Sequence, residues 1–392
     1  MAELTPAQLA RRSSRRRLAR RIAAGLALGL IVAGWISTDG LMAFGGSPSD
    51  ATVERMRASP RFVSDHFENA EPTGVMKGGT AAATWAWFTG PEMRAPICPL
   101  PLVTDTAARI AAPPPSGLRV TWLGHSTTLI EIDGNTVLTD PMWSQRASPS
   151  TWVGPQRFHP PPLPFVDLPH VDAVVISHEH YDHLDMATIR ALAARGPTFH
   201  VALGVGAHLE AWGVPAAQIV EQDWWEAATL PGGLSVISTP ARHFSGRGVP
   251  MRVGASWTSW SLVGPKHRVF FSGDTGLTEA FREIAARNGP FDLALLEIGQ
   301  YDPSWGDIHL GPVGALDAHA MLGAKRLFPI HWATFQLGMH AWSEPAETLT
   351  ALAAKRGVSL VTPQLGEPVE PTLGAASTPW WRAFPPIAAQ CP

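Results

Sequence analysis

The 392-residue sequence predicts an α/β fold in which two β-sheets pack together and are flanked by helices. Composition is the first indication: 45% hydrophobic and 16% charged residues allow one sizeable α/β domain with additions. From residue 118 onward, strand-like and helix-like runs alternate, yet several neighbouring strands are joined as hairpins. That mixture fits two packed sheets better than one doubly wound parallel sheet.

The individual elements follow from the residue pattern. Apolar runs rich in β-branched and aromatic residues predict strands over residues 118–122, 127–132, 136–139, 173–176, 234–238, 258–263, 268–272, 293–298 and 358–362. Asp133-Gly134-Asn135 predicts a hairpin turn between the second and third of these strands. Helix-like runs cover residues 186–195, 278–288, 312–322 and 345–356.

Three segments divide the chain. Residues 1–44 form a basic N-terminus with a signal sequence or membrane anchor, and residues 45–116 form an irregular lead-in rich in Pro and Gly. Residues 117–392 form the main domain, on which we expect the lead-in to pack. The net charge is -3 although the first 21 residues hold seven Arg and one Glu, so the remainder is acidic and gives no support to nucleic-acid binding.

The N-terminus predicts attachment to a membrane. Residues 22–36 are uncharged, and this run of fifteen residues fits the apolar core of a signal sequence. It is short for a membrane span, which needs about 20 residues. Because arginines stay on the cytoplasmic side, we expect an inner-membrane anchor with the rest of the chain outside the cytoplasm. A cleaved signal peptide and a disordered basic tail before an amphipathic helix are the alternatives.

A histidine-rich loop after the predicted strand 173–176 is the most informative stretch. His178, His180, Asp182 and His183 lie within six residues. Imidazole and carboxylate together suit zinc, with manganese or iron as second choices. Four ligands exceed what one ion takes from so short a loop, so two adjacent ions are indicated. A surface loop that happens to be rich in histidine is the alternative. The only cysteines, Cys98 and Cys391, form no Cys-x-x-Cys pair, so sulfur is not an expected ligand.

Three further candidate ligands each follow an apolar strand: His243, Asp274 and His331. A buried core histidine or a helix N-cap would be the ordinary role of each alone. Taken with the loop, they predict that one zinc ion is bound by His178, His180 and His243, a second by Asp182, His183 and His331, and that Asp274 bridges the two. Asp140 ends the strand 136–139 and is expected to orient a ligand histidine.

At these residues the chain resembles the metallo-β-lactamase-fold hydrolases. The resemblance rests on His178-x-His180-x-Asp182-His183, followed in order by His243, Asp274 and His331, and it implies an αββα sandwich with the metals at one edge of the sheets. Narrower motifs are similar to the N-acylphosphatidylethanolamine-hydrolysing phospholipase D family. Among them are residues 122–127, 138–141, 223–226, 260–265 and 331–335.

This resemblance implies roles for residues beyond the ligands. His309 matches a histidine that faces the substrate phosphate, and Tyr301 and Trp305 lie in a matching loop expected to bind substrate. Asp182, Asp274 and His309 are then the catalytic residues. Gly311 and Gly314 stand where acidic residues are usual in the family, which leaves the head-group preference open.

The implied function is a dinuclear-zinc phosphodiesterase that hydrolyses N-acylphosphatidylethanolamine-type phospholipids to phosphatidate and N-acylethanolamine through a metal-bridging hydroxide. A metal-dependent lactonase, or another small-substrate hydrolase of the same fold, is the alternative. A non-catalytic, membrane-tethered zinc-binding protein is the second. The expected partners are the phospholipid and the membrane, without nucleic acid, and a homodimer is one candidate assembly.

Overall fold

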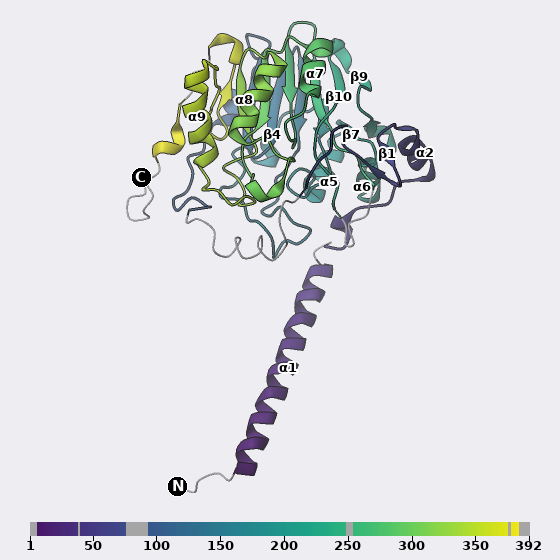
Figure 1. The fold of residues 1–392 in the computed structure, drawn as a ribbon, viewed down its shortest axis with the longest axis vertical. Helices are drawn as coiled ribbons and strands as arrows, with labels where there is room; N and C mark the ends of the chain where they lie inside the picture. Colours follow the sequence, from purple (N-terminus) through teal and green to yellow (C-terminus); the bar gives the residue numbers. More distant parts are fainter. Residues whose placement is uncertain (1–5, 38–39, 76–92, 248–253, 375–377, 384–392) are drawn as a thin grey trace.

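Two β-sheets lie face to face in the body of the molecule, and helices cover their outer faces (Figure 1). The structure is a computed structural model that describes residues 6–37, 40–75, 93–247, 254–374 and 378–383. A two-stranded ribbon of β1 (Phe62–Val63) and β2 (His66–Phe67) lies beside this body.

The first sheet has seven strands in the order β15-β3-β4-β5-β6-β7-β8. They are β3 (Leu118–Gly124), β4 (Thr127–Ile132), β5 (Asn135–Thr139), β6 (Ala173–Ile176), β7 (Thr198–Ala202), β8 (Ile219–Gln222) and β15 (Pro368–Val369). Pairing is antiparallel from β15 to β5 and parallel from β5 to β8. Asp133 and Gly134 have φ values of 50° and 85°, as the two-residue turn requires, so the predicted hairpin is confirmed.

The second sheet has six strands in the order β14-β13-β12-β11-β10-β9. They are β9 (Ala227–Thr229), β10 (Ser235–Thr239), β11 (Ser259–Val263), β12 (Arg268–Phe271), β13 (Leu293–Glu297) and β14 (Leu327–Ile330). Pairing is antiparallel from β9 to β12 and parallel from β12 to β14. The strand predicted over 358–362 is wrong, because this stretch contributes only an isolated bridge from Leu360 to Leu327.

The α-helices are α1 (Pro6–Ser37), α2 (Asp50–Ala58), α4 (Thr106–Arg109), α5 (Met186–Ala193), α6 (Gly206–Ala211), α7 (Ala280–Asn288), α8 (Gly311–Leu322) and α9 (Glu344–Arg356). Short 3-10 helices are η1 (Met42–Phe44), η2 (Phe165–Asp167), η3 (Ala216–Gln218), η4 (Pro231–Gly233), η5 (Pro303–Trp305), η6 (Pro371–Leu373) and η7 (Trp380–Ala383). The four predicted helices are confirmed as α5, α7, α8 and α9.

Apolar side chains from both sheets fill the space between them. Val120 and Val175 of the first sheet share one buried cluster with Val236, Leu262 and Phe271 of the second. Burying a side chain of this size stabilises the fold by about 1.5–3 kcal/mol. The spacing between the sheets is therefore set by close packing.

Each sheet also packs against helices on its outer face. On the first sheet, Val174 and Ile176 pack with Ile189 of α5 and Leu209 of α6. On the second sheet, α7, α8 and α9 contribute buried side chains to the same cluster as β13. The layers run helix, sheet, sheet, helix, and the predicted αββα sandwich is confirmed.

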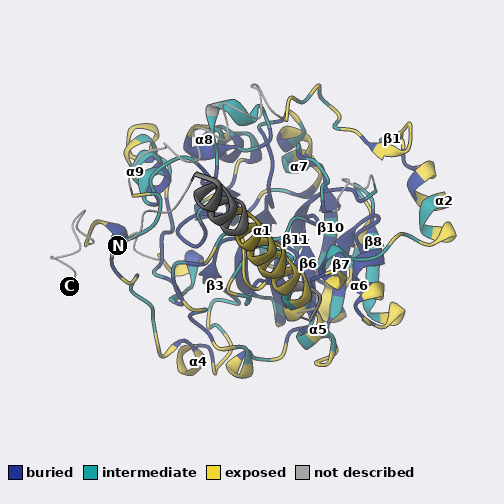
Figure 2. Ribbon diagram, turned by 90° about the horizontal axis from the view of Figure 1, so that it is seen from below, coloured by how far each residue is buried: buried dark blue, intermediate teal, exposed yellow. Residues whose placement is uncertain are grey.

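The N-terminal helix α1 projects away from the body (Figure 1), and Figure 2 shows exposed residues along it. Leu26, Leu30 and Ile31 on this helix are 65%, 73% and 57% exposed. Among the helices that the structure describes, none combines the length and hydropathy needed to cross a membrane.

The lead-in is less irregular than the sequence predicts. Ser49 caps the nine-residue helix α2 by accepting a hydrogen bond from the Thr52 N–H at 3.2 Å. Arg61 binds the Asp223 carboxylate at 2.5 Å and lies 3.6 Å over the Trp224 ring. These contacts attach the lead-in to the main domain.

Candidate metal centre

The predicted ligands gather where strands of both sheets end. The loop with His178, His180, Asp182 and His183 follows β6 of the first sheet. His243, Asp274 and His331 follow β10, β12 and β14 of the second sheet. The structure brings all seven side chains together in overlapping groups of ligand atoms, each group within 4.8 Å.

His178, His180 and His243 form the first group. The Nε2 atoms of His178 and His243 lie 2.9 and 3.2 Å from Nδ1 of His180. On the far side of the His243 ring, Nδ1 lies 3.0 Å from the Ile308 carbonyl oxygen, to which it can donate. That bond leaves the lone pair of His243 Nε2 facing the group, as a metal ligand requires.

Asp182, His183 and His331 form the second group, and His125 joins it. Oδ2 of Asp182 lies 3.3 Å from Nε2 of His183 and 3.4 Å from Nε2 of His331. Nε2 of His125 lies 2.8 Å from the same carboxylate oxygen. The second group therefore contains one imidazole more than the sequence analysis predicted.

Asp274 lies between the two groups. Its carboxylate oxygens are 3.2 Å from Nε2 of His183 and 3.1 Å from Nε2 of His331. The same carboxylate is 3.8 Å from His178 and 3.9 Å from His243. This is the position expected of a bridging ligand.

Several atoms of the cluster have no hydrogen-bond partner among the described residues. They are Nε2 of His183, Nε2 of His331 and Oδ1 of Asp274, all buried; the contacts of 3.2 and 3.1 Å to the Asp274 carboxylate are close enough for ion pairs but lack hydrogen-bond geometry. An unsatisfied buried polar group costs about 1–3 kcal/mol, so such atoms are rare unless a ligand completes them. Imidazole nitrogens with carboxylate oxygens are the donor set that zinc prefers, and the residues fit metal ions.

Neighbouring charges divide the imidazoles into two kinds. Burial, with help from adjacent imidazoles, holds the pKa of His178 and His243 well below the ordinary 6.5. His183 and His331 behave in the opposite way: burial opposes their charge, but Asp274 and Asp182 raise the pKa of His183 well above 6.5 and that of His331 to about 10. The carboxylates therefore favour positive charge at the second group.

Asp140 contacts the side of the His183 ring that faces away from the cluster. Its Oδ2 lies 2.7 Å from Nδ1 of His183, and its two oxygens accept hydrogen bonds from the Ser177 N–H and hydroxyl at 2.7 and 2.6 Å. The bond to Nδ1 fixes the tautomer of His183 and turns Nε2 toward the cluster. The structure thus places Asp140 where the sequence predicted a residue that orients a ligand histidine.

His309 lies beside both groups. Its ring centroid is 5.3 Å from that of His243 and 5.5 Å from that of His331. Nδ1 of His309 lies 2.7 Å from Oε2 of Glu297, which is fully buried at the end of β13. Glu297 thereby holds the imidazole in place through Nδ1, and within the described part of the chain no hydrogen bond engages Nε2.

Of the two other predicted substrate residues, Trp305 lies near the site and Tyr301 faces elsewhere. The Trp305 ring is 5.7 Å from that of His309. The Tyr301 hydroxyl donates to Glu344 at 2.6 Å, and its ring stacks on His340. No hydrogen bond or ring contact within the described residues joins Tyr301 to a candidate ligand.

Two residues of the site, His125 and Glu297, were not predicted. His125 lies in the turn between β3 and β4, where a β-bulge and a positive φ of 51° set its direction. The local sequence pattern does not indicate where the His125 side chain points. Glu297, in contrast, is a single charged residue ending the apolar run 293–296, the same signal that identified other site residues.

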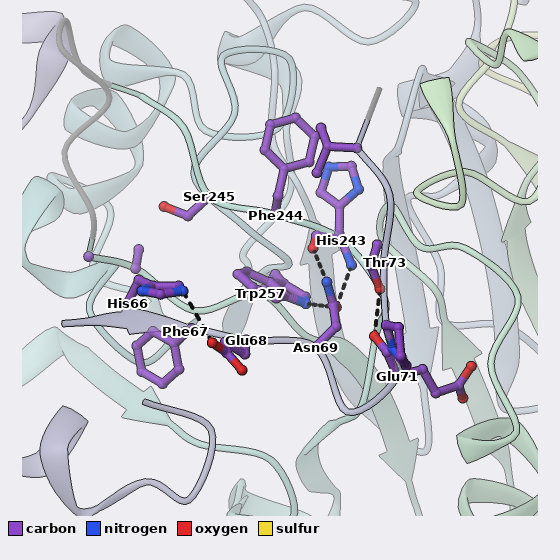
Figure 3. Close-up of a pocket in the computed structure, with 14 residues that line it drawn as sticks. His66, Phe67, Glu68, Asn69, Glu71, Thr73, His243, Phe244, Ser245 and Trp257 are labelled. Carbon is purple, nitrogen blue, oxygen red and sulfur yellow. Dashed lines mark hydrogen bonds and ion pairs between the residues drawn. The ribbon is translucent and has the colours of Figure 1, made fainter. Parts of the chain in front are cut away.

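A cavity of about 590 Å³ opens beside His243 (Figure 3). Phe67, Phe244, Val75 and Trp257 supply much of its apolar lining. One wall comes from the lead-in, between His66 and Val75, and the other comes from residues 243–245 and 254–257. The arrangement can admit an apolar part of a substrate next to the metal cluster.

Comparison with known proteins agrees with this geometry. Residues 135–332 match the beta-lactamase superfamily domain. The uncharacterized protein Rv0906 of Mycobacterium tuberculosis is 46% identical over 356 residues, which are 87% of this chain and 94% of that protein. N-acyl-phosphatidylethanolamine-hydrolyzing phospholipase D 1 of Caenorhabditis elegans is 35% identical over 268 residues, 64% of this chain and 75% of the relative.

Among solved structures, the chain is similar to Igni18, a metallo hydrolase from the archaeon Ignicoccus hospitalis. The TM-score is 0.50 at 24% sequence identity, and the alignment covers 64% of this chain and 97% of Igni18. At this identity the likeness supports the fold alone.

Replacing Asp140 by Ala should weaken zinc binding by about 10–100-fold, because His183 would lose the partner that orients it. Competition with a chromophoric chelator measures the change. Asp167→Ala, which removes an exposed carboxylate, is the control and should bind zinc as the unchanged protein does. Unaltered affinity in Asp140→Ala would show that the orienting role is wrong.

Zinc uptake by metal-free protein at pH 7 should release protons mainly with one of the two equivalents, the one that fills the group of Asp182, His183 and His331. His331, with a pKa raised to about 10, carries a proton at pH 7 that the metal must displace, whereas His178 and His243 are already neutral. Calorimetric titrations in buffers of different ionisation enthalpy count these protons. Release should decline as the pH approaches 10. Equal release with both equivalents would contradict this division of the imidazoles.

Proposed function

We propose that this chain, which belongs to the metallo-β-lactamase superfamily of hydrolases, is a dinuclear-zinc phosphodiesterase acting on N-acylphosphatidylethanolamine-type phospholipids. The products would be phosphatidate and N-acylethanolamine. The observation that carries the proposal is the pair of ligand groups joined by Asp274, with His309 beside both. The name of the Caenorhabditis elegans relative supports the class of substrate.

Metal ions in the two groups would supply Lewis acidity and activate the attacking water. Asp274 holds the groups together, since its carboxylate lies within 4 Å of His178, His183 and His331. His125, through its 2.8 Å contact with Asp182, orients that carboxylate toward His183 and His331. The protein thereby fixes the positions of the ligands before substrate binds.

His309 is the residue best placed to handle the phosphate. Glu297 accepts a hydrogen bond from Nδ1–H, and a protonated Nε2 on the other side of the ring can donate to a phosphate oxygen. As the water oxygen bonds to phosphorus, the bond to the ethanolamine-side oxygen breaks. Transfer of the Nε2 proton to that oxygen would release N-acylethanolamine as a neutral alcohol, with phosphatidate as the other product. The proton that the attacking water loses would then restore the proton on Nε2.

Gly311 stands where an acidic residue is usual in the phospholipase D family. Its φ is 57°, and a Cβ placed there would lie 3.3 Å from the Tyr301 ring. An acidic side chain at this position would therefore be strained and would crowd Tyr301. We infer that His309 and the cavity beside His243 make the contacts that select the substrate.

Purified, zinc-loaded protein should release N-acylethanolamine from N-acylphosphatidylethanolamine in detergent, and Asp274→Asn should abolish this release because one bridging oxygen is lost. Mass spectrometry of the products measures both. Phosphatidylcholine and a sugar lactone are offered in parallel. Turnover of the lactone alone would favour the lactonase alternative, and no turnover at full metal occupancy would favour a zinc-binding protein without catalysis.

We also propose that α1 attaches the protein to a membrane, with the main domain outside the cytoplasm. Exposed apolar side chains on α1 support the attachment, as do Trp152 and Val153, which are 65% and 63% exposed next to this helix. Attachment would confine the enzyme to the surface where a phospholipid substrate is found.

Deleting residues 1–37 should release the protein from the membrane fraction and leave turnover of a soluble phosphodiester unchanged. The deletion spares the Met42 and Ala43 carbonyls, which accept hydrogen bonds from Trp212 and Arg247 of the main domain. Sedimentation of cell fractions measures the distribution. Full-length protein with Leu26→Asp and Leu30→Asp is the matched variant and should be released as well. Membrane retention of the truncated chain would contradict the attachment.

A further inference from the structure

One part of the lead-in, residues 69–74, lies along the two loops that carry His243 and His309. The Gly74 carbonyl accepts a hydrogen bond from the Asp307 N–H at 3.0 Å, two residues before His309. Nε of Arg242, the residue before His243, donates to the Thr73 hydroxyl at 3.0 Å. At the start of this segment, Asn69 contacts His243 itself (Figure 3).

Asn69 binds both backbone groups of His243. Its Nδ2 donates to the His243 carbonyl oxygen at 2.7 Å, and its Oδ1 accepts from the His243 N–H at 3.0 Å. Trp257 Nε1 donates to the same Oδ1 at 3.0 Å. The indole N–H is shared with the Ala241 carbonyl oxygen, also at 3.0 Å. Because both the His243 N–H and the indole N–H can only donate, the end of the amide that faces them is assigned as the oxygen.

The loop around His243 depends on such side-chain contacts. Residues 240–247, which follow β10, are not in a helix or strand. A neighbouring strand therefore does not hold the backbone of His243, and the amide of Asn69 makes the two bonds that a paired strand would make. In the side chain of His243, Nδ1 can donate a hydrogen bond to the Ile308 carbonyl oxygen.

We propose that Asn69 is a positioning residue for the metal centre. By binding the backbone N–H and carbonyl of His243, it sets where Nε2 lies relative to His178 and His180. The lead-in is then part of the site, although it lies 174 positions from His243 in the sequence. The inference rests on the proposed metal dependence and is independent of the lipid substrate.

Two variants of Asn69 test the proposal. Asn69→Asp keeps the shape and the acceptor oxygen but replaces the donor, so a carboxylate oxygen faces the His243 carbonyl. Asn69→Ala removes both bonds. Zinc affinity, measured by competition with a chelator, should fall by about 10–100-fold for one ion and stay unchanged for the other. The visible absorption bands of cobalt-substituted protein should change for the same ion.

Arg55→Ala is the control. It removes an exposed ion pair of 2.9 Å between the lead-in and Glu226, and should leave the zinc affinities and the cobalt spectrum as they are. Near-ultraviolet circular dichroism shows whether each variant is folded.

Unchanged metal affinity and cobalt spectrum in both Asn69 variants would overturn the proposal. So would an equal loss in Arg55→Ala, or unfolding of both Asn69 variants, since Asn69 would then serve general stability. A changed zinc affinity in protein that fails to hydrolyse any phospholipid would reject the proposed substrate and leave the role of Asn69 standing.

Discussion

The carboxylate of Asp274 is the contact on which the rest of the site depends. It follows a strand of the second sheet, yet it lies against His183 from the first sheet and His331 from its own. Burial alone would make this carboxylate costly, but His183 and His331 hold its pKa well below the ordinary value. Metal ions bound by ligands from both sheets would also offset the cost of burying the Asp274 charge. The αββα sandwich makes this possible because it brings ligands from the two sheets close together.

Three of the ligand histidines are also held from the side of the ring that faces away from the cluster. His183 is bound by a carboxylate, Asp140, and His243 by a carbonyl, Ile308. Nδ1 of His331 lies 3.2 Å from the Gly299 carbonyl. These outer bonds fix tautomers and ring directions, so the geometry of the centre is set by residues that would not touch the metal.

Local patterns in the sequence predicted most of the candidate metal ligands. The loop from His178 to His183 carries four ligands within six positions, and Asp274 and His331 follow short apolar strands. Glu297 could have been found by the same reasoning. His125 could not, because a bulge and a positive φ decide where its side chain points. The strand predicted over 358–362 failed because pairing depends on neighbours that the local run does not reveal.

Anomalous X-ray diffraction at the zinc edge from crystals of zinc-loaded protein tests the central claim most directly. Two peaks are predicted, one among His178, His180 and His243 and one among Asp182, His183 and His331, with Asp274 between them. A single peak, or peaks only at other positions, would contradict a two-metal centre that joins the sheets.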